Sequence, residues 1–279
     1  MTATTSAALG APETMPQGKA TYAAGGGVAL ITLTNPPANG YSHAMMRDLD
    51  EAVLRARFDD AVHVIVLAGA GEKFFCAGAD IAMLDAVTPT FKYQFCLHAN
   101  ETLLRLEHTP KLVIAALGGH CVGGGLEIAL ACDLRVARRG SGKTGLPEVA
   151  LGVLPGTGGT QRLARIVGKS RAIELMASGR LIAYEEALTL GLVDEVRDAA
   201  DDATFLLGVI DYAKSFCAPG KAPLAVGLIK RAVQTGSEIP LEQGLALERE
   251  LQARLFSSND AKEGIQAFVQ KRAAKFEGR

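Results

Sequence analysis

The chain has 279 residues, of which 48% are hydrophobic, and its 29 Lys and Arg balance 30 Asp and Glu. A chain of this length buries roughly 70 to 75% of the surface that its unfolded state exposes, enough for one large domain or a core with an appendage. The near-zero net charge and the lack of basic runs interleaved with aromatic residues argue against a nucleic-acid-binding protein. No uninterrupted apolar stretch approaches the roughly 18 residues that span a bilayer, so we expect no membrane segment.

The cysteines and the N-terminal segment indicate a reducing compartment. The sequence holds five scattered cysteines, Cys76, Cys96, Cys121, Cys132 and Cys217. Their odd number and the lack of CxxC spacing are typical of reduced cysteines rather than of a disulfide framework or a zinc site. Residues 1–18 contain no Lys, no Arg and no apolar run of signal-peptide length. We therefore expect a disordered tail over 1–18 and a cytoplasmic protein without a bound metal.

In the first half of the chain, buried strands alternate with helices. Residues 28–33 follow three glycines and predict the second strand of a hairpin whose first strand lies near 20–23. Apolar positions at helical spacing predict a helix over 43–59. The further expected elements are strands at 62–68, 112–117 and 133–137, helices at 91–107 and 126–131, and a loop at 74–80. The unit strand, strand, helix repeats, which predicts a superhelical α/β core.

From about residue 200 onward the chain is expected to be purely helical. A connector rich in glycine and proline occupies 146–159, and the last strand is expected at 192–196. The expected helices cover 160–166, 170–178, 184–190, 200–217, 221–235, 240–256 and 260–275. We therefore expect an α/β core over 19–199 and a helical C-terminal module over 200–279.

Two glycine-rich segments resemble nucleotide-binding motifs without meeting their requirements. Residues 140–144 (GSGKT) lack the first glycine of a P-loop, and Gly145 and Pro147 interrupt the helix that such a loop needs. A charged flexible surface loop is the better interpretation. Residues 156–159 (GTGG) lack the third glycine of a dinucleotide fingerprint and the long strand before it, so they do not support NAD binding.

A turn with three consecutive glycines, Gly123, Gly124 and Gly125, lies between a predicted strand and a predicted helix. Any single glycine here is explained by crowding in a tight turn. Three in a row favour a site where free N–H groups at a helix N-terminus bind an oxygen with partial negative charge.

Two carboxylates accompany this turn. Glu127 lies three residues after Gly124, among apolar neighbours that leave little solvent around it. It is either a first-turn acid favoured by the helix dipole or a functional group, and its surroundings favour the second. Glu148 is either an exposed loop acid or the second carboxylate of one pocket, where the two would supply an acid and a base.

The glycine turn and both acids lie within motifs that resemble the crotonase (enoyl-CoA hydratase/isomerase) family. The matching segments are 76–81 (CAGADI), 120–127 (HCVGGGLE), 146–148 (LPE), 151–163 (LGVLPGTGGTQRL), 263–268 (EGIQAF) and 271–276 (KRAAKF). The similarity spans about residues 20–276, and the order of several long motifs makes it specific. It implies a crotonase-type superhelix of repeated ββα units with a C-terminal helical module for trimerisation.

The resemblance also implies the reaction. In the family, the carbonyl of an acyl-CoA thioester lies between two backbone N–H groups, which fall here on Ala79 and Gly124. Family hydratases hold a water between two glutamates, matched by Glu127 and Glu148. This implies an enoyl-CoA hydratase, a hydro-lyase of fatty acid metabolism that adds water reversibly and syn to a short-chain 2-enoyl-CoA. By analogy Glu127 activates the water and Glu148 protonates the α-carbon, and CoA enters only as part of the substrate.

Positions expected to bind CoA follow from the same resemblance. They are Ala38, Ala77, Asp80, Ile81, Ala82 and Lys275. Ala82 stands where many members have a lysine near the CoA phosphates, and Lys275 is the expected replacement. Residues 39–42 (NGYS) replace the more usual Asn-Ala-Leu-Ser of the family in a segment expected near the adenine.

Two other functions remain open at this point. Family members that lack one glutamate are usually isomerases, hydrolases or decarboxylases, so an enoyl-CoA isomerase or another acyl-CoA enzyme is the nearest alternative. A non-catalytic RNA-binding relative is more remote, since the chain has no basic runs. The resemblance further implies a homotrimer or a dimer of trimers, that is, a homohexamer.

Overall fold

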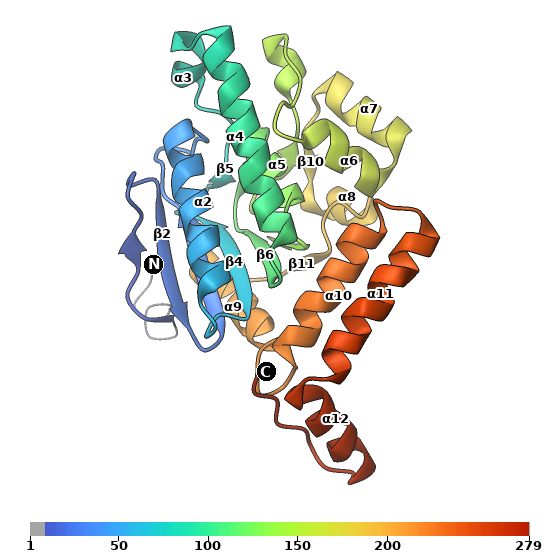
Figure 1. Ribbon diagram of the computed structural model, residues 1–279. Coiled ribbons are helices and arrows are strands. Elements are labelled where there is room, and N and C mark those ends of the chain that lie inside the picture. Colours follow the sequence, from blue (N-terminus) through green and yellow to red (C-terminus); the bar gives the residue numbers. More distant parts are fainter. Residues whose placement is uncertain (1–8, 279) are drawn as a thin grey trace.

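A seven-stranded sheet forms the centre of the computed structural model, which describes residues 9–278 (Figure 1). The first two neighbouring pairs are antiparallel and the other four are parallel. In spatial order the strands are β1 (Glu13–Thr14), β2 (Ala20–Gly25), β3 (Val28–Leu33), β4 (Val64–Gly69), β6 (Leu112–Leu117), β8 (Leu134–Arg138) and β11 (Glu195–Arg197).

A second, four-stranded sheet carries the loops of the site. Its strands are, in spatial order, β10 (Ile182–Ala183), β9 (Lys143–Gly145), β7 (His120–Val122) and β5 (Phe74–Cys76). The chain leaves β4, β6 and β8 of the first sheet for β5, β7 and β9 of the second, and a helix follows each pair. Gly119 marks one such change of sheet, because a Cβ there would collide with the backbone of Lys73. The repeated ββα unit expected from the sequence is confirmed.

Helices surround both sheets. They are α2 (His43–Phe58), α3 (Ile81–Ala86), α4 (Pro89–His108), α5 (Gly124–Leu130), α6 (Gly159–Val167), α7 (Lys169–Ser178), α8 (Tyr184–Thr189), α9 (Asp202–Lys214), α10 (Pro223–Gly236), α11 (Leu241–Phe256) and α12 (Asn259–Val269), with a 3-10 turn, η1, at Glu148–Leu151.

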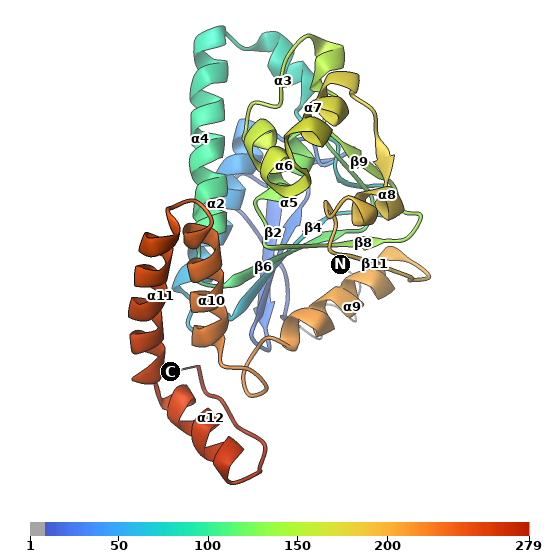
Figure 2. The same cartoon turned by 90° about the vertical axis from the view of Figure 1, so that its right-hand side faces the viewer.

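The central parallel strands are buried on both faces, as their unbroken aliphatic sequences predict. In β4, Ile65 and Leu67 belong to the core that α2, α4 and α5 share. Val64 and Val66 point to the other face, where they pack in one core with Phe205 of α9. Figure 2 shows α9 below β8 and β11, with α5 and α6 above them. The sheet is therefore a rigid support for the loops at its upper side.

The C-terminal helices form an arm beside this core. Helices α10 and α11 lie side by side, and α12 extends away below them in both views (Figures 1 and 2). Lys230 of α10 fastens the arm to the core through a buried ion pair of 2.8 Å with Asp133, next to β8. Helix α9 packs on the sheet through Phe205, and α10 contacts α4 and β6 of the core. The division into a core over 19–199 and a helical module over 200–279 stays a prediction.

Some expectations differ from the structure. Part of the supposed tail, residues 9–18, is ordered: β1 pairs with β2, Met15 is buried, and the Gln17 N–H donates to Asp48 at 2.7 Å. Residues 1–8 of that tail lie outside the described residues. The expected loop at 140–144 contains the start of β9, because Thr144 is buried in pairing with both β7 and β10.

Candidate active site

The triple-glycine turn joins β7 to α5. Gly123 has a φ of 56°, a left-handed conformation that glycine adopts without strain, and its N–H donates to the Gly145 carbonyl at 2.9 Å. Gly124 is the first residue of α5, so its N–H has no acceptor within the helix. A Cβ on Gly125 would collide with the carbonyl oxygen of Cys76. The turn thus needs glycine both for its conformation and for contact with β5.

The loop after β5 brings the second amide next to this turn. An ideal Cβ on Gly78 would lie 3.6 Å from the Gly124 nitrogen, so the two segments touch. Gly78 and Asp80 make the backbone hydrogen bonds to Tyr41, at 2.8 and 3.0 Å. In such a parallel bridge the N–H of the residue between them, Ala79, points away from Tyr41. Two backbone amides are therefore available on adjacent segments.

Glu127 is held by the start of α6. It is 2% exposed, and its Oε1 accepts the N–H groups of Thr157 and Gly159, both at 2.8 Å. Its Oε2 accepts the hydroxyl of Thr157. A helix N-terminus is a natural anion site, and here the carboxylate of Glu127 occupies it. These three hydrogen bonds orient the side chain and stabilise its negative charge.

The environment of Glu148 is the opposite of that of Glu127. It begins η1, and its Oε2 is buried without a hydrogen-bond partner among residues 9–278. Burial, and next the negative charge of Glu127, raise the pKa of Glu148 from 4.5 to about 7, against the opposing charge of Lys92. Its Oε1 lies against the glycine turn, since a Cβ on Gly123 would be 2.9 Å away. A carboxyl with this pKa is able to both give and take a proton near neutral pH.

The structure separates the expected CoA positions into two groups. Ala38 and Ala77 lie side by side, since the Ala77 N–H donates to the Ala38 carbonyl at 3.0 Å. Asp80 caps the N-terminus of α3, where Ile81 and Ala82 are exposed. All five are at least partly exposed, and three of them directly follow Ala79 in the sequence.

Lys275 forms the second group by itself. Its side chain is exposed and its N–H donates to Glu263 of α12 at 2.9 Å. In Figures 1 and 2, the C-terminal segment and α3 lie at opposite ends of the molecule. Within one chain, the structure does not bring Lys275 together with the segment around Ala79.

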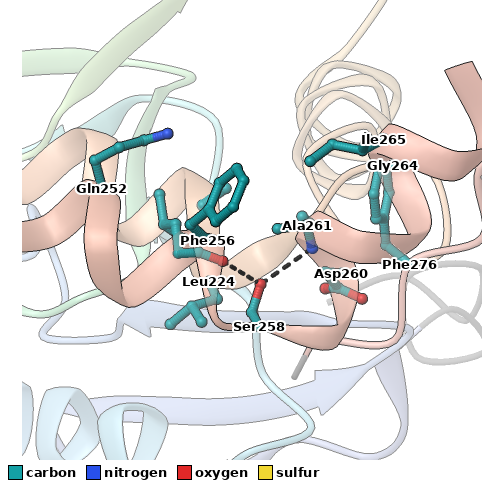
Figure 3. A pocket seen from close by; sticks show the side chains of 12 residues that line it. Leu224, Gln252, Phe256, Ser258, Asp260, Ala261, Gly264, Ile265 and Phe276 are labelled. Carbon is teal, nitrogen blue, oxygen red and sulfur yellow. Dashed lines mark hydrogen bonds between the residues drawn. The ribbon is translucent and has the colours of Figure 1, made fainter.

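Figure 3 shows a different pocket, between α10, α11 and α12. This cavity of about 370 Å³ is lined mainly by apolar side chains, among them Phe256, Ile265 and Phe276. Ser258 donates its hydroxyl to the Leu255 carbonyl at 2.7 Å and accepts the Ala261 N–H at 3.1 Å. No residue of the glycine turn and neither glutamate lines this pocket, so it is separate from the candidate site.

Other sequence features contribute nothing to the site. Within residues 9–278 there is no cluster of three His, Cys, Asp or Glu side chains able to hold a metal ion, and no helix long and apolar enough to cross a membrane. The five cysteines are free thiols. The nitrogen Nδ1 of His120 accepts the Lys143 N–H at 3.1 Å, which joins β7 to β9 and gives this histidine a structural role.

Sequence reasoning missed three contributors to the site. Thr157 was assigned to a connector, although its hydroxyl and N–H both bind Glu127. Lys92 lies in the helix expected at 91–107 without any motif around it. Tyr41 lies in the segment expected near the adenine, although its ring packs against Gly124. The only available signal was the Gly-Thr-Gly-Gly segment, whose glycines indicate a close backbone approach.

Comparisons with known proteins show the family of the chain. A model of the enoyl-CoA hydratase/isomerase family matches residues 23–279, and the chain belongs to this family. It is 37% identical to the short-chain-enoyl-CoA hydratase of Clostridium acetobutylicum, covering 91% of this chain and 94% of the relative. It is also 37% identical to the 2,3-dehydroadipyl-CoA hydratase of Escherichia coli, covering 90% and 96%.

Solved structures confirm the crotonase-type fold. The enoyl-CoA hydratase of Geobacillus kaustophilus superposes with a TM-score of 0.90 at 44% identity, covering 94% of this chain and 97% of that one. The fold class expected from the ββα repeat and the family resemblance is thus correct.

Proposed function

We propose that this chain is an enoyl-CoA hydratase, a hydro-lyase that interconverts a 2-enoyl-CoA and a 3-hydroxyacyl-CoA. The proposal rests on one observation: two carboxyl groups in opposite environments lie at the same glycine turn. Glu127 is held by three hydrogen bonds, whereas Glu148 has a free buried oxygen and a pKa of about 7. Pairs of titratable groups with such different environments are typical of acid and base partners.

The amides of Ala79 and Gly124 are proposed to bind the thioester carbonyl oxygen. Negative charge develops on this oxygen when a nucleophile adds to the conjugated double bond. Donors fixed in advance stabilise that charge without reorganising during the reaction. Because both donors belong to the backbone, their placement depends on the loops that carry them.

The carboxyls then supply the two proton transfers. The water oxygen bonds to C3 while one water proton moves to Glu127, and the C2 carbon receives a proton from Glu148. Both new bonds form on the face of the substrate that the carboxyls occupy, which corresponds to syn addition. The two carboxyls together hold one proton, which lies on Glu148 before the reaction and on Glu127 after it. Exchange with solvent returns the proton to Glu148. The reverse reaction uses the same groups with exchanged roles, and neither direction requires a metal or an organic cofactor.

The acyl-CoA substrate is proposed to be short. Support comes from the similarity to a relative named short-chain-enoyl-CoA hydratase. The CoA part is proposed to lie along Ala38, Ala77 and Asp80, with Ile81 and Ala82. A series of enoyl-CoA chain lengths tests this assignment, which predicts that kcat/KM is highest for the shortest acyl chains and falls as the chain lengthens.

Homotrimers, or dimers of trimers, are proposed as the assembly. Ile229 and Val233 of α10 are 60% and 67% exposed, and Leu241 of α11 is 78% exposed. Exposed apolar patches of this kind mark protein contacts. Because Lys275 lies far from Ala82 in its own chain, it is proposed to reach the CoA of a neighbouring copy. A monomer in sedimentation would contradict both statements.

The activity is tested with crotonyl-CoA and the purified protein. Hydration removes the conjugated double bond, so the absorbance of the enoyl thioester falls. The isomerase alternative is tested with a 3-enoyl-CoA, whose conversion to the 2-enoyl-CoA raises the same absorbance. Constant absorbance with crotonyl-CoA and other 2-enoyl-CoA esters would contradict the hydratase proposal, and a rise with only the 3-enoyl-CoA would favour the isomerase.

A further inference from the structure

Tyr41 contacts both segments that carry the candidate amides. Its backbone N–H donates to the Gly78 carbonyl at 2.8 Å, and its own carbonyl accepts the Asp80 N–H at 3.0 Å. These two bonds hold the peptide of Ala79 from both sides. The orientation of the Ala79 N–H therefore depends on the backbone of Tyr41.

The ring of Tyr41 packs against the other segment. An ideal Cβ on Gly124 would lie 2.6 Å from Tyr41 Cδ1, so the ring occupies the space that any side chain there would need. Phe95 of α4 supports the ring, with 5.0 Å between the ring centroids. Tyr41 is 2% exposed. One rigid side chain thus sets how closely the Gly124 amide approaches Ala79.

The hydroxyl of Tyr41 lies next to Thr157 and Glu127. Burial raises the pKa of Tyr41 well above its ordinary value, and the charge of Glu127 adds to this shift while Thr157 opposes it. Among residues 9–278 the hydroxyl makes no hydrogen bond of standard geometry. Burying an unpaired hydroxyl costs about 1 to 3 kcal/mol, whereas an apolar ring would fill the same space without that cost. Other buried hydroxyls, such as that of Tyr22, are also unpaired, but the hydroxyl of Tyr41 lies next to Thr157 and Glu127.

We propose that Tyr41 is a positioning residue of the active site, whose ring and backbone fix the two amides and whose hydroxyl orients Thr157 and, through it, Glu127. The inference rests on the proposed function of those groups. A hydroxyl that donates to Thr157 Oγ1 directs the Thr157 hydrogen toward the Glu127 carboxylate. Hydrogen bonds in such a chain polarise one another in a low-dielectric interior, which strengthens the bond to the carboxylate.

Two substitutions separate the parts of this role. Tyr41→Phe keeps the ring and removes the hydroxyl, and it lowers kcat for crotonyl-CoA about tenfold with KM unchanged, the loss that corresponds to one hydrogen bond. Tyr41→Leu also removes the ring and lowers kcat by about 100-fold, since small displacements of reacting groups have effects of this size. Tyr22→Phe is the control, because Tyr22 of β2 is equally buried and its hydroxyl is equally unpaired. It leaves kcat unchanged.

A spectroscopic measurement distinguishes failure of this inference from failure of the proposed function. Acetoacetyl-CoA is not a hydration substrate, and amides that polarise its thioester carbonyl stabilise the absorbing enolate. We expect this band with the wild-type protein and with Tyr22→Phe, and a weaker band with Tyr41→Leu. If the wild-type protein shows the enolate band but does not hydrate crotonyl-CoA, the hydratase proposal is contradicted. The strength of the band with Tyr41→Leu still tests the role of the ring in that case.

Each part of the inference has its own contradicting result. Wild-type kcat in Tyr41→Phe would overturn the role of the hydroxyl. A wild-type protein that shows the enolate band without hydration would overturn that role too, because the hydroxyl is proposed to act through Glu127. A wild-type band in Tyr41→Leu would overturn the role of the ring. Absence of both the band and hydration in the wild-type protein would overturn the whole assignment. If Tyr41→Leu does not fold, Tyr41→Phe still tests the inference.

Discussion

Glu148 lies close enough to Glu127 that, after burial, the charge of Glu127 is the next cause that raises the pKa of Glu148 to about 7. The charge of Glu127 therefore disfavours the ionised form of Glu148. Three donors stabilise the charge on Glu127, and Glu148 has an oxygen without a partner. With one proton in the pair, the structure favours its location on Glu148.

This pairing predicts the pH dependence of the reaction. The active form carries one proton, and the pair loses it as the pH rises through the raised pKa of Glu148, about 7. We expect kcat/KM, which reports the free enzyme, to fall above pH 7. Hydration releases no proton overall, so its equilibrium constant does not depend on pH, and kcat/KM for dehydration follows the same curve. A profile flat from pH 6 to about 9 in both directions would contradict an acid role for Glu148.

Substitution of either carboxyl tests whether both take part. Glu127→Gln and Glu148→Gln keep the size of the side chain and remove the proton transfer, so each is expected to lower kcat by about 100- to 10,000-fold. The control is Glu51→Gln, because Glu51 is exposed on the surface of α2. Kinetics with crotonyl-CoA check the result. An enzyme that keeps wild-type kcat after loss of one glutamate would have a one-base mechanism, as expected for an isomerase.

Thr157 provides a graded test of how Glu127 is held. Thr157→Val removes the hydroxyl that donates to Glu127 Oε2 but keeps the N–H that donates to Oε1. Hydrogen bonds to charged groups contribute about 1.5 to 3 kcal/mol, so kcat is expected to fall about 10- to 100-fold. Thr157→Ser restores a hydroxyl and most of the rate. Equal kcat values for the Val and Ser variants would show that the hydroxyl does not assist Glu127.

Gly124→Ala tests the close packing of the turn. The new Cβ would lie 2.6 Å from the Tyr41 ring, so one of the two segments must move. We expect a loss of about 1 to 3 kcal/mol in the free energy of unfolding and a fall in kcat of about 100-fold. Gly208→Ala in α9 is the control, because its Cβ meets no atom within 4 Å. There, alanine is expected to stabilise the helix by about 0.5 to 1 kcal/mol. Wild-type activity and stability of Gly124→Ala would contradict the described packing.

The sequence predicted the elements with strong local signals. The mostly aliphatic runs at 28–33 and 112–117 form β3 and β6 at those residues, because both faces of each strand are buried. The three-residue strand β9 was missed because its residues are paired by distant strands rather than by their own pattern. Helix α12 ends at Val269 rather than near 275.

The site was predictable only where its residues are neighbours in the sequence. Gly124 and Glu127 occur within one helical turn, and spacing alone connected them. Thr157 lies 30 residues after Glu127, and Tyr41 reaches Gly124 only through the pairing of two loops. Such contacts depend on tertiary structure, which a single sequence does not contain. The pKa of Glu148 likewise depends on burial by distant segments.

The central claim is that two carboxyls add water across the double bond of a 2-enoyl-CoA. The most direct test is to follow the oxygen and the proton of the added water into the product. Crotonyl-CoA is incubated with the enzyme in ¹⁸O-labelled water and, separately, in deuterated water, and the product is analysed by mass spectrometry and NMR. The two-carboxyl mechanism predicts one ¹⁸O at C3 and one deuterium at C2, added to the same face. A product with deuterium at a carbon but without ¹⁸O at C3 would contradict hydration and indicate a shift of the double bond instead.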